Sequence, residues 1–246
     1  MARNPVEWIP YCGAAPAPAE LFARWNFDPP LLLGIGLAAA LAWRIPRLRT
    51  WRTAAALAIV LVLFVSPFCA LGSALFSARV VHHLVLALVL GPLLAPALGP
   101  ARWLERWSLA ALTAVQAIVF WAWHAPGLYA LALSSDAVFW LMQLSITASA
   151  ALWWARLRQA PPAAALGALL ATMVQMGLLG ALITFAARPL YAPHWLTTQD
   201  WGLSPLDDQQ LAGLIMWAPG SLVYLLAAVA MLYRSLGPAA GRAAKA

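Results

Sequence analysis

Seven apolar stretches divide the chain, and they constrain its fold more than any other feature. They cover residues 29–43, 53–73, 80–99, 108–131, 137–155, 163–187 and 211–233. A helix needs about 20 apolar residues to cross about 30 Å of hydrocarbon, and only the first stretch is shorter. Only 9% of the residues are charged, too few to cover a water-facing surface. The sequence therefore predicts an all-α integral membrane protein with seven transmembrane helices.

Charged residues fall unevenly on the loops between these stretches. One set of alternate loops carries eleven basic residues against Glu105 alone, and the other carries four basic residues against seven acids. These net charges of +10 and −3 together give the +7 of the whole chain. Because basic residues collect on the cytoplasmic side, we expect a periplasmic N-terminus outside the membrane and a cytoplasmic C-terminus. The excess of basic over acidic residues thus reflects the membrane topology, and no nucleic-acid partner is expected.

The domain organisation that follows is simple. We expect a periplasmic segment over residues 1–28, one seven-helix transmembrane domain over residues 29–233 and a cytoplasmic tail over residues 234–246. No basic region followed by a compact apolar core opens the chain, so a cleaved signal peptide is not expected. No convincing internal repeat is present, which weakens the case for an inverted-repeat transporter.

Polar and sulfur-containing side chains gather in the predicted outer halves of the spans. Ionisable groups inside membrane helices normally face the bundle interior and mark a functional site. His, Met and Cys side chains are also the ligands that suit copper(I). We therefore predict a metal site, with this set of candidate ligands: His83, His124, Met142, Met216 and Cys69.

Other polar groups at the same depth are expected to support this site. Arg79 and His83 lie four residues apart and share one helix face, whereas His82 is turned away by about 100°. The residues Asp208, Gln209 and Gln210 begin the last span, where they could orient the imidazoles through their free nitrogens. The predicted pocket residues are Arg79, His82, Gln143, Asp208, Gln209 and Gln210.

Several of these side chains have a purely structural alternative. His82 could be an interfacial residue, Met142 and Met216 could fill the core, and Arg79 could reach the lipid headgroups. His194 lies in a loop, where we expect a solvated or interfacial side chain.

The cysteines and the two adjacent acids have alternatives of their own. Cys12 and Cys69 both face the oxidising compartment, so they could form a structural disulfide. Asp207 or Asp208 could cap the helix that they precede.

No signature of a soluble enzyme is present. The sequence contains no phosphate-binding glycine loop and no H-E-x-x-H, G-x-S-x-G or C-x-x-C motif. We therefore expect that the protein is not an enzyme.

Four segments of the sequence resemble successive signatures of one membrane-protein family. They read "SPFCALGSALFSARVVHHLVL", "WAWHAPGLYALAL", "GALITFAARPLY" and "SPLDDQQLAGLIMWAPGS". The chain is identified by them as a member of the multi-span CtaG-like cytochrome c oxidase assembly factors, and its opening "YCGAAPAP" is similar to the proteobacterial branch. The resemblance implies a multi-pass protein of the bacterial inner membrane. It also implies partners, namely the catalytic subunit of a haem–copper oxidase or other assembly factors, in addition to membrane lipid.

The resemblance implies that copper is bound or delivered for the copper centre of the oxidase, with transient copper(I) as the expected cargo. The chain departs from the family pattern H-M-x-Q-H, because Arg79 replaces the first histidine and His82 replaces the glutamine. Met142 and Gln143 stand where many members carry another histidine. Alternative functions are a copper or cation transporter, a haem-handling protein and a scaffold without metal.

Overall fold

The structure is a computed structural model that describes residues 9–98 and 102–236. These residues form helices and connecting loops, with no strand among them. Residues 1–8 of the predicted periplasmic segment and residues 237–246 of the predicted tail lie outside the described part.

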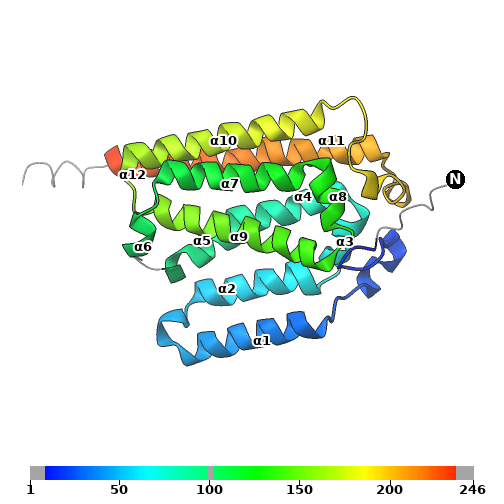
Figure 1. Cartoon of the computed structure of the whole chain (residues 1–246), viewed down its shortest axis with the longest axis horizontal. Coiled ribbons are helices and arrows are strands. Elements are labelled where there is room, and N and C mark those ends of the chain that lie inside the picture. Colours follow the sequence, from blue (N-terminus) through cyan, green and yellow to red (C-terminus); the bar gives the residue numbers. More distant parts are fainter. Residues whose placement is uncertain (1–8, 99–101, 237–246) are drawn as a thin grey trace, which may run out of the picture.

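The longer helices run along one common direction and form an elongated bundle (Figure 1). At one end of the bundle lie residues 9–28, helix α8 and the loop from 185 to 204, and we call this the loop-rich end. The α-helices are α1 (Pro29–Arg44), α2 (Trp51–Val60), α3 (Phe68–Ala74), α4 (Phe76–Val85), α5 (Gly91–Leu94), α6 (Arg102–Glu105), α7 (Leu109–His124), α8 (Pro126–Ala132), α9 (Asp136–Leu157), α10 (Pro162–Thr184), α11 (Pro205–Ile215) and α12 (Ser221–Leu236). Three π-helical turns continue α2, α4 and α11, namely η3 (Leu61–Val65), η4 (Leu86–Leu90) and η8 (Met216–Gly220).

Four continuous helical segments are long and apolar enough to cross a membrane. They are Phe76–Leu98, Asp136–Leu157, Pro162–Thr184 and Pro205–Ser235. Two bent pairs raise the number to six if each pair is one span: Trp51–Val65 with Phe68–Ala74, and Leu109–His124 with Pro126–Ala132. The remaining predicted span is α1, whose 16 residues are about 24 Å long. The chain is thus a multi-pass membrane protein of four to six such helices in its described part, and seven spans and the orientation of the termini stay predictions.

Proline explains both bends. The helices in the bent pairs meet at 45° and 76°. Pro67 begins the turn before α3, and Pro126 is the first residue of α8. The residue before a proline is driven out of the helical conformation, as Ala125 is with ψ 126°. His124 is consequently the last residue of α7, and its carbonyl oxygen accepts a hydrogen bond from the Tyr191 hydroxyl at 2.8 Å.

Helices α10 and α11 approach each other most closely where two glycines meet. A Cβ atom on Gly180 would lie 2.8 Å from the Gly213 carbonyl oxygen, and a Cβ atom on Gly213 would lie 2.6 Å from the Gly180 carbonyl oxygen. Small residues allow such backbone contact between membrane helices, where no hydrophobic effect drives association. Helix α11 also packs against α4, so this contact fixes the helix that carries His82 and His83.

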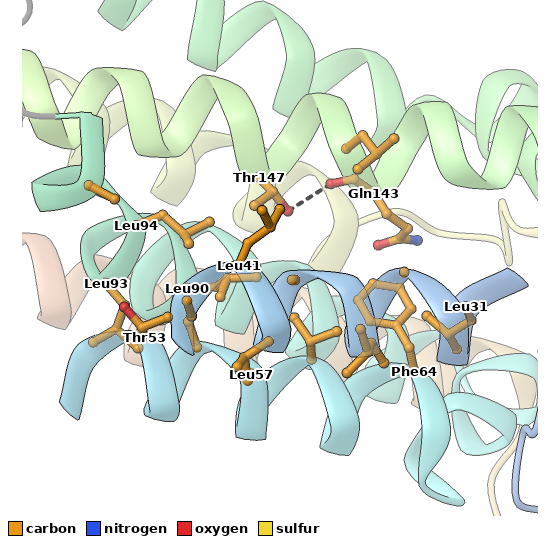
Figure 2. Close-up of a pocket in the computed structure, with 18 of the residues that line it drawn as sticks. Leu31, Leu41, Thr53, Leu57, Phe64, Leu90, Leu93, Leu94, Gln143 and Thr147 are labelled. Atoms are coloured by element: carbon orange, nitrogen blue, oxygen red, sulfur yellow. Dashed lines mark hydrogen bonds between the residues drawn. The ribbon is translucent and has the colours of Figure 1, made fainter. Parts of the chain in front are cut away.

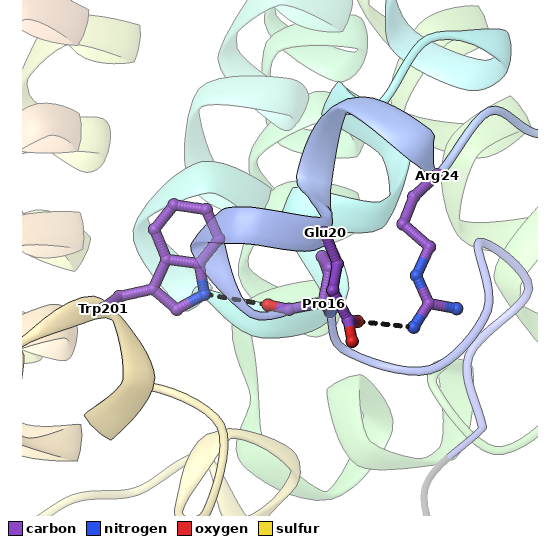
Figure 3. A network of polar contacts seen from close by, with 4 residues as sticks. All are labelled: Pro16, Glu20, Arg24 and Trp201. Carbon is purple, nitrogen blue, oxygen red and sulfur yellow. Dashed lines mark hydrogen bonds and ion pairs between the residues drawn. The ribbon is translucent and has the colours of Figure 1, made fainter.

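The segment before α1 is held at the loop-rich end by a disulfide and a hydrogen bond. Cys12 forms a disulfide with Cys69 of α3, which is the structural alternative considered for these two residues. The Trp201 indole donates a hydrogen bond to the Pro16 carbonyl oxygen at 3.1 Å, and Arg24 pairs with Glu20 at 2.8 Å (Figure 3). The disulfide and the indole hydrogen bond connect three segments that are far apart in the sequence, whereas the Arg24–Glu20 pair is local.

Replacement of both cysteines by serine is expected to lower the stability by about 2–4 kcal/mol, because the disulfide closes a long loop in the unfolded chain. Thermal unfolding followed by circular dichroism should show a lower midpoint than in the native protein. A reducing agent should lower the midpoint of the native protein and leave that of the variant unchanged. Equal midpoints for the two proteins would contradict a stabilising role of the Cys12–Cys69 bond.

Candidate functional site

Two histidines from different helices meet inside the bundle. His83 on α4 is fully buried, and His124 at the end of α7 is only 2% exposed. Their ring centres lie 5.2 Å apart, with the ring planes nearly perpendicular at 87°. The structure therefore brings together the two histidines that the sequence predicted as ligands.

The hydrogen bonds of this pair leave ring nitrogens free. His124 Nδ1 lies 2.6 Å from the Phe120 carbonyl oxygen, which can only accept, so Nδ1 carries the proton. The Nε2 atom of His124 then holds a lone pair, and no described residue forms a hydrogen bond with it. Neither ring nitrogen of His83 has a partner in the described part of the chain. A metal-binding histidine typically donates its other N–H to a carbonyl in this way.

His82 lies next to this pair but in aromatic surroundings. Its ring centre is 6.2 Å from that of His83. It makes an edge-to-face contact with Phe64, with ring centres 4.9 Å apart. Phe68 stacks on it at 6.1 Å, and neither ring nitrogen bonds to another described residue. His82 is buried, so it does not have the interfacial position considered as its structural alternative.

The sulfur-containing candidates divide into two groups. Met142 on α9 and Met216 on η8 are fully buried in the core cluster that also contains Phe120. The turn η8 packs against α4, which carries His83. Cys69 is bonded to Cys12, so its sulfur is not a free thiolate in this structure.

Arg79 is a fully buried cation. Its Nε atom donates to the Gly72 carbonyl oxygen at 3.2 Å, and its guanidinium carbon lies 5.2 Å from the centre of the Phe139 ring. Among the described residues no carboxylate forms an ion pair with it. Arg79 is thus buried without a carboxylate partner among the described residues, and it does not have the headgroup position considered as its structural alternative.

Asp208 instead holds the start of α4. Its carboxylate accepts hydrogen bonds from the backbone N–H of Phe76 at 2.7 Å and of Ser77 at 3.2 Å, and from the Ser77 hydroxyl. These are first-turn donors, which have no partner within their own helix. Asp207 caps its own helix through a reciprocal pair of hydrogen bonds with Ser204. Asp208 therefore positions the helix that carries the histidines and does not bond to an imidazole.

Gln209, which follows Asp208, also differs from expectation. Gln209 accepts from the Leu190 N–H at 2.6 Å and donates to the carbonyl oxygens of Ile183 at 3.2 Å and Arg188 at 3.3 Å. It thereby ties the loop after α10 to α11. Gln210 is half-buried, and Gln143 on α9 lines a separate cavity described below.

The expectation of a solvated or interfacial His194 is wrong. The side chain is only 2% exposed, and its Nε2 lies 2.7 Å from the Tyr129 hydroxyl. Its Nδ1 faces the Ala74 carbonyl oxygen at 3.3 Å. Tyr129 packs in turn against Phe76 and Tyr191. Sequence reasoning missed this aromatic cluster because its members lie in three distant segments, although Tyr129 falls within one of the quoted signatures.

The burial of His194 predicts a loss of stability in acid. Burial lowers the pKa of His194 to about 3, from the usual value of 6.5. The unfolded chain binds the proton more readily than the folded protein does. The contribution of neutral His194 to stability is therefore complete above pH 6.5 and decreases as the pH falls toward 3. At pH 4.5 the loss should reach roughly 2–3 kcal/mol.

The His194→Gln variant isolates this effect from the other titrating groups. Its thermal midpoint should fall less between pH 7.5 and pH 4.5 than that of the native protein. If the thermal midpoints of the two proteins fell in parallel with pH, the loss of stability in acid would not be due to His194.

The described residues contain no cluster of three or more His, Cys, Asp or Glu side chains that could hold a metal ion. The His83–His124 pair offers two nitrogen ligands in a buried site, with His82 beside it and the Arg79 cation one helical turn away on α4. Such a pair suits an ion that accepts low coordination and soft neighbours.

Comparison with known families agrees with this architecture. The family model described as cytochrome c oxidase caa3 assembly factor (Caa3_CtaG) matches residues 32–237. No curated protein and no solved structure gives a match to the chain. Because the family match covers most of the sequence, including α4, α7 and α11, the protein belongs to the cytochrome c oxidase caa3 assembly factor family.

Proposed function

We propose that this assembly factor carries copper(I) as cargo on His83 and His124 and delivers it to the catalytic subunit of the oxidase. The observation that carries the proposal is the hydrogen bond from His124 Nδ1 to the Phe120 carbonyl oxygen, which leaves Nε2 free to bind a metal ion. The carbonyl fixes the tautomer and the ring orientation before any ion arrives.

The ring geometry of the pair fits one ion between two imidazoles. A metal ion binds imidazole nitrogen at about 2 Å, so rings with centres 5.2 Å apart can each direct a nitrogen to the same point. The ligands are neutral imidazoles, and copper(I) accepts the low coordination that two such nitrogens offer. Met142 or Met216 would supply a third ligand.

The same geometry favours copper over haem. Axial ligation of haem requires the two imidazoles to lie on opposite faces of a flat macrocycle. Two rings with centres 5.2 Å apart and planes at 87° leave no room for the macrocycle between them. We therefore assign the pair to a single small ion.

The proposal is tested in a bacterial strain that lacks this chain and receives variants of it. His124→Phe keeps an aromatic ring against Phe120 and removes both nitrogens. We expect the oxidase purified from this strain to contain at least tenfold less copper than oxidase matured with the native chain. His82→Phe is the matched control, because its ring already lies between Phe64 and Phe68, and it should support a normal copper content.

Two results would count against copper delivery. Normal copper content with His83→Phe, His124→Phe in a well-expressed chain would favour a scaffold without metal. An equal loss of oxidase copper with His82→Phe and with His124→Phe would show that the effect is not specific to the His83–His124 pair.

A further inference from the structure

A long cavity runs beside α1 and α2. Its volume is about 640 Å³, and its walls come from α1, α2, α5 and α9 (Figure 2). Most of the lining is aliphatic, as Leu31, Leu57, Leu90 and Leu94 illustrate. The cavity lies among apolar helices, so its natural occupants are molecules dissolved in the bilayer.

The cavity is elongated along α1. Its lining includes Leu31 near the start of that helix and Leu41 near its end, a separation of about 15 Å at 1.5 Å per residue. Leu48 and Thr53 extend the wall beyond α1. This shape suits a hydrocarbon tail better than a compact solute.

One polar group in the wall has no partner. The Gln143 side chain leaves α9 and carries its amide toward the space between α9 and α1 (Figure 2). The residue is 1% exposed, and neither its Oε1 nor its Nε2 forms a hydrogen bond with another described residue. A buried amide without partners is unfavourable, so a ligand that supplies hydrogen-bond partners would be favoured.

The other polar groups of the lining are already satisfied. Asp28 accepts hydrogen bonds from the Tyr11 hydroxyl at 2.7 Å and from the Leu31 N–H at 3.1 Å. The Thr147 hydroxyl donates to the Gln143 backbone carbonyl at 2.8 Å, and the Thr53 hydroxyl lies 3.2 Å from that of Thr50. The Gln143 amide is therefore the group that a ligand head would contact.

Flat aromatic rings line the same cavity as this amide. Phe64 and Trp140 both line the cavity, and their rings stack with centres 5.1 Å apart. Trp140 precedes Gln143 by three residues, so the two side chains lie on the same side of α9. A ligand head that meets Gln143 would thus also meet an aromatic surface.

We propose that this cavity binds an isoprenoid quinone. The Gln143 amide offers one acceptor and two donor hydrogens, which match the carbonyl oxygens of a quinone and the hydroxyls of its reduced form. The ring would lie against Trp140 and Phe64, and the isoprenoid tail would follow α1. Gln143 lies seven residues, or about 10 Å, beyond the start of α9, which is too deep for the charged head of a phospholipid.

The test uses the full chain in detergent and a decyl-substituted benzoquinone as the probe, with complexes counted by native mass spectrometry. Gln143→Leu keeps the side-chain size and removes the hydrogen bonds, so the dissociation constant should rise about tenfold, whereas palmitate binding should not change. Gln210→Leu is the matched control and should bind the probe normally. Ala38→Trp places a bulky ring in the cavity and should abolish binding of both probes.

Two outcomes would overturn the proposal. Native affinity of the quinone for the Gln143→Leu variant would show that the amide takes no part. Palmitate or a phospholipid that displaces the quinone at equal concentration would make the cavity a general lipid groove. The Gln143→Leu variant tests the role of the amide even if Ala38→Trp fails to fold.

Discussion

The Asp208→Ala variant is expected to lose about 3–5 kcal/mol of stability, because two backbone N–H groups and one hydroxyl lose their acceptor inside the protein. Those donors belong to Phe76 and Ser77, in the first turn of α4. Asp208 is fully buried, so water cannot replace the carboxylate without opening the structure. Thermal unfolding of the purified variant in detergent measures the loss. Under the proposed function the variant should also bind less copper, since α4 carries His83.

Asp207→Ala provides the matched control. Asp207 is exposed and serves only to cap its own helix with Ser204. Asp207→Ala removes one half of this capping box and leaves the Ser204 hydroxyl as the N-cap, so its loss of stability should be much smaller than that of Asp208→Ala. A loss of stability as large for Asp207→Ala as for Asp208→Ala would contradict the assignment of Asp208 as the residue that holds α4.

The Gly213→Ala variant is expected to lose about 3 kcal/mol or more of stability. The new Cβ atom would lie 2.6 Å from the Gly180 carbonyl oxygen and 2.7 Å from the Thr184 backbone nitrogen. Both obstacles are backbone atoms of α10, so the helices must move apart, and overpacking of this kind typically costs 1–3 kcal/mol or more. The midpoint of thermal unfolding in detergent is the measurement.

Gly167→Ala on α10 is the corresponding control. Apart from its chain neighbours and the nearby backbone of its own helix, no atom lies within 4 Å of a Cβ atom built at that position. Its stability should stay within about 0.5 kcal/mol of the native protein or rise slightly. Equal destabilisation by both variants would indicate that the helix backbone, and not the contact between α10 and α11, responds to the substitution.

Apolar length predicted the positions of the helices well. The predicted stretch 163–187 corresponds to α10 and the stretch 137–155 to α9. Length could not reveal that two other stretches contain sharp bends, because the bend angle depends on how the residue before each proline is held. The family that the motifs indicated is confirmed by the match over residues 32–237.

The candidate site could be predicted only in part. Helical phase and depth indicated that His83 and His124 face a common interior, and the structure places their rings together. The partner of Asp208 could not be predicted, since an acid near one helix start can bond to another helix that is distant in sequence. Disulfide pairing of Cys12 and Cys69 was also open, because the sequence does not fix the distance between a loop and α3.

The central claim is that copper(I) is held by the two imidazoles, and X-ray absorption at the copper edge tests it most directly. Native protein loaded anaerobically with copper(I) should show nitrogen ligands at about 2 Å with the outer-shell pattern of imidazole rings. That pattern should disappear in the His83→Phe, His124→Phe variant and persist in His82→Phe. A spectrum of the native protein with sulfur ligands alone, at about 2.3 Å, would contradict the claim.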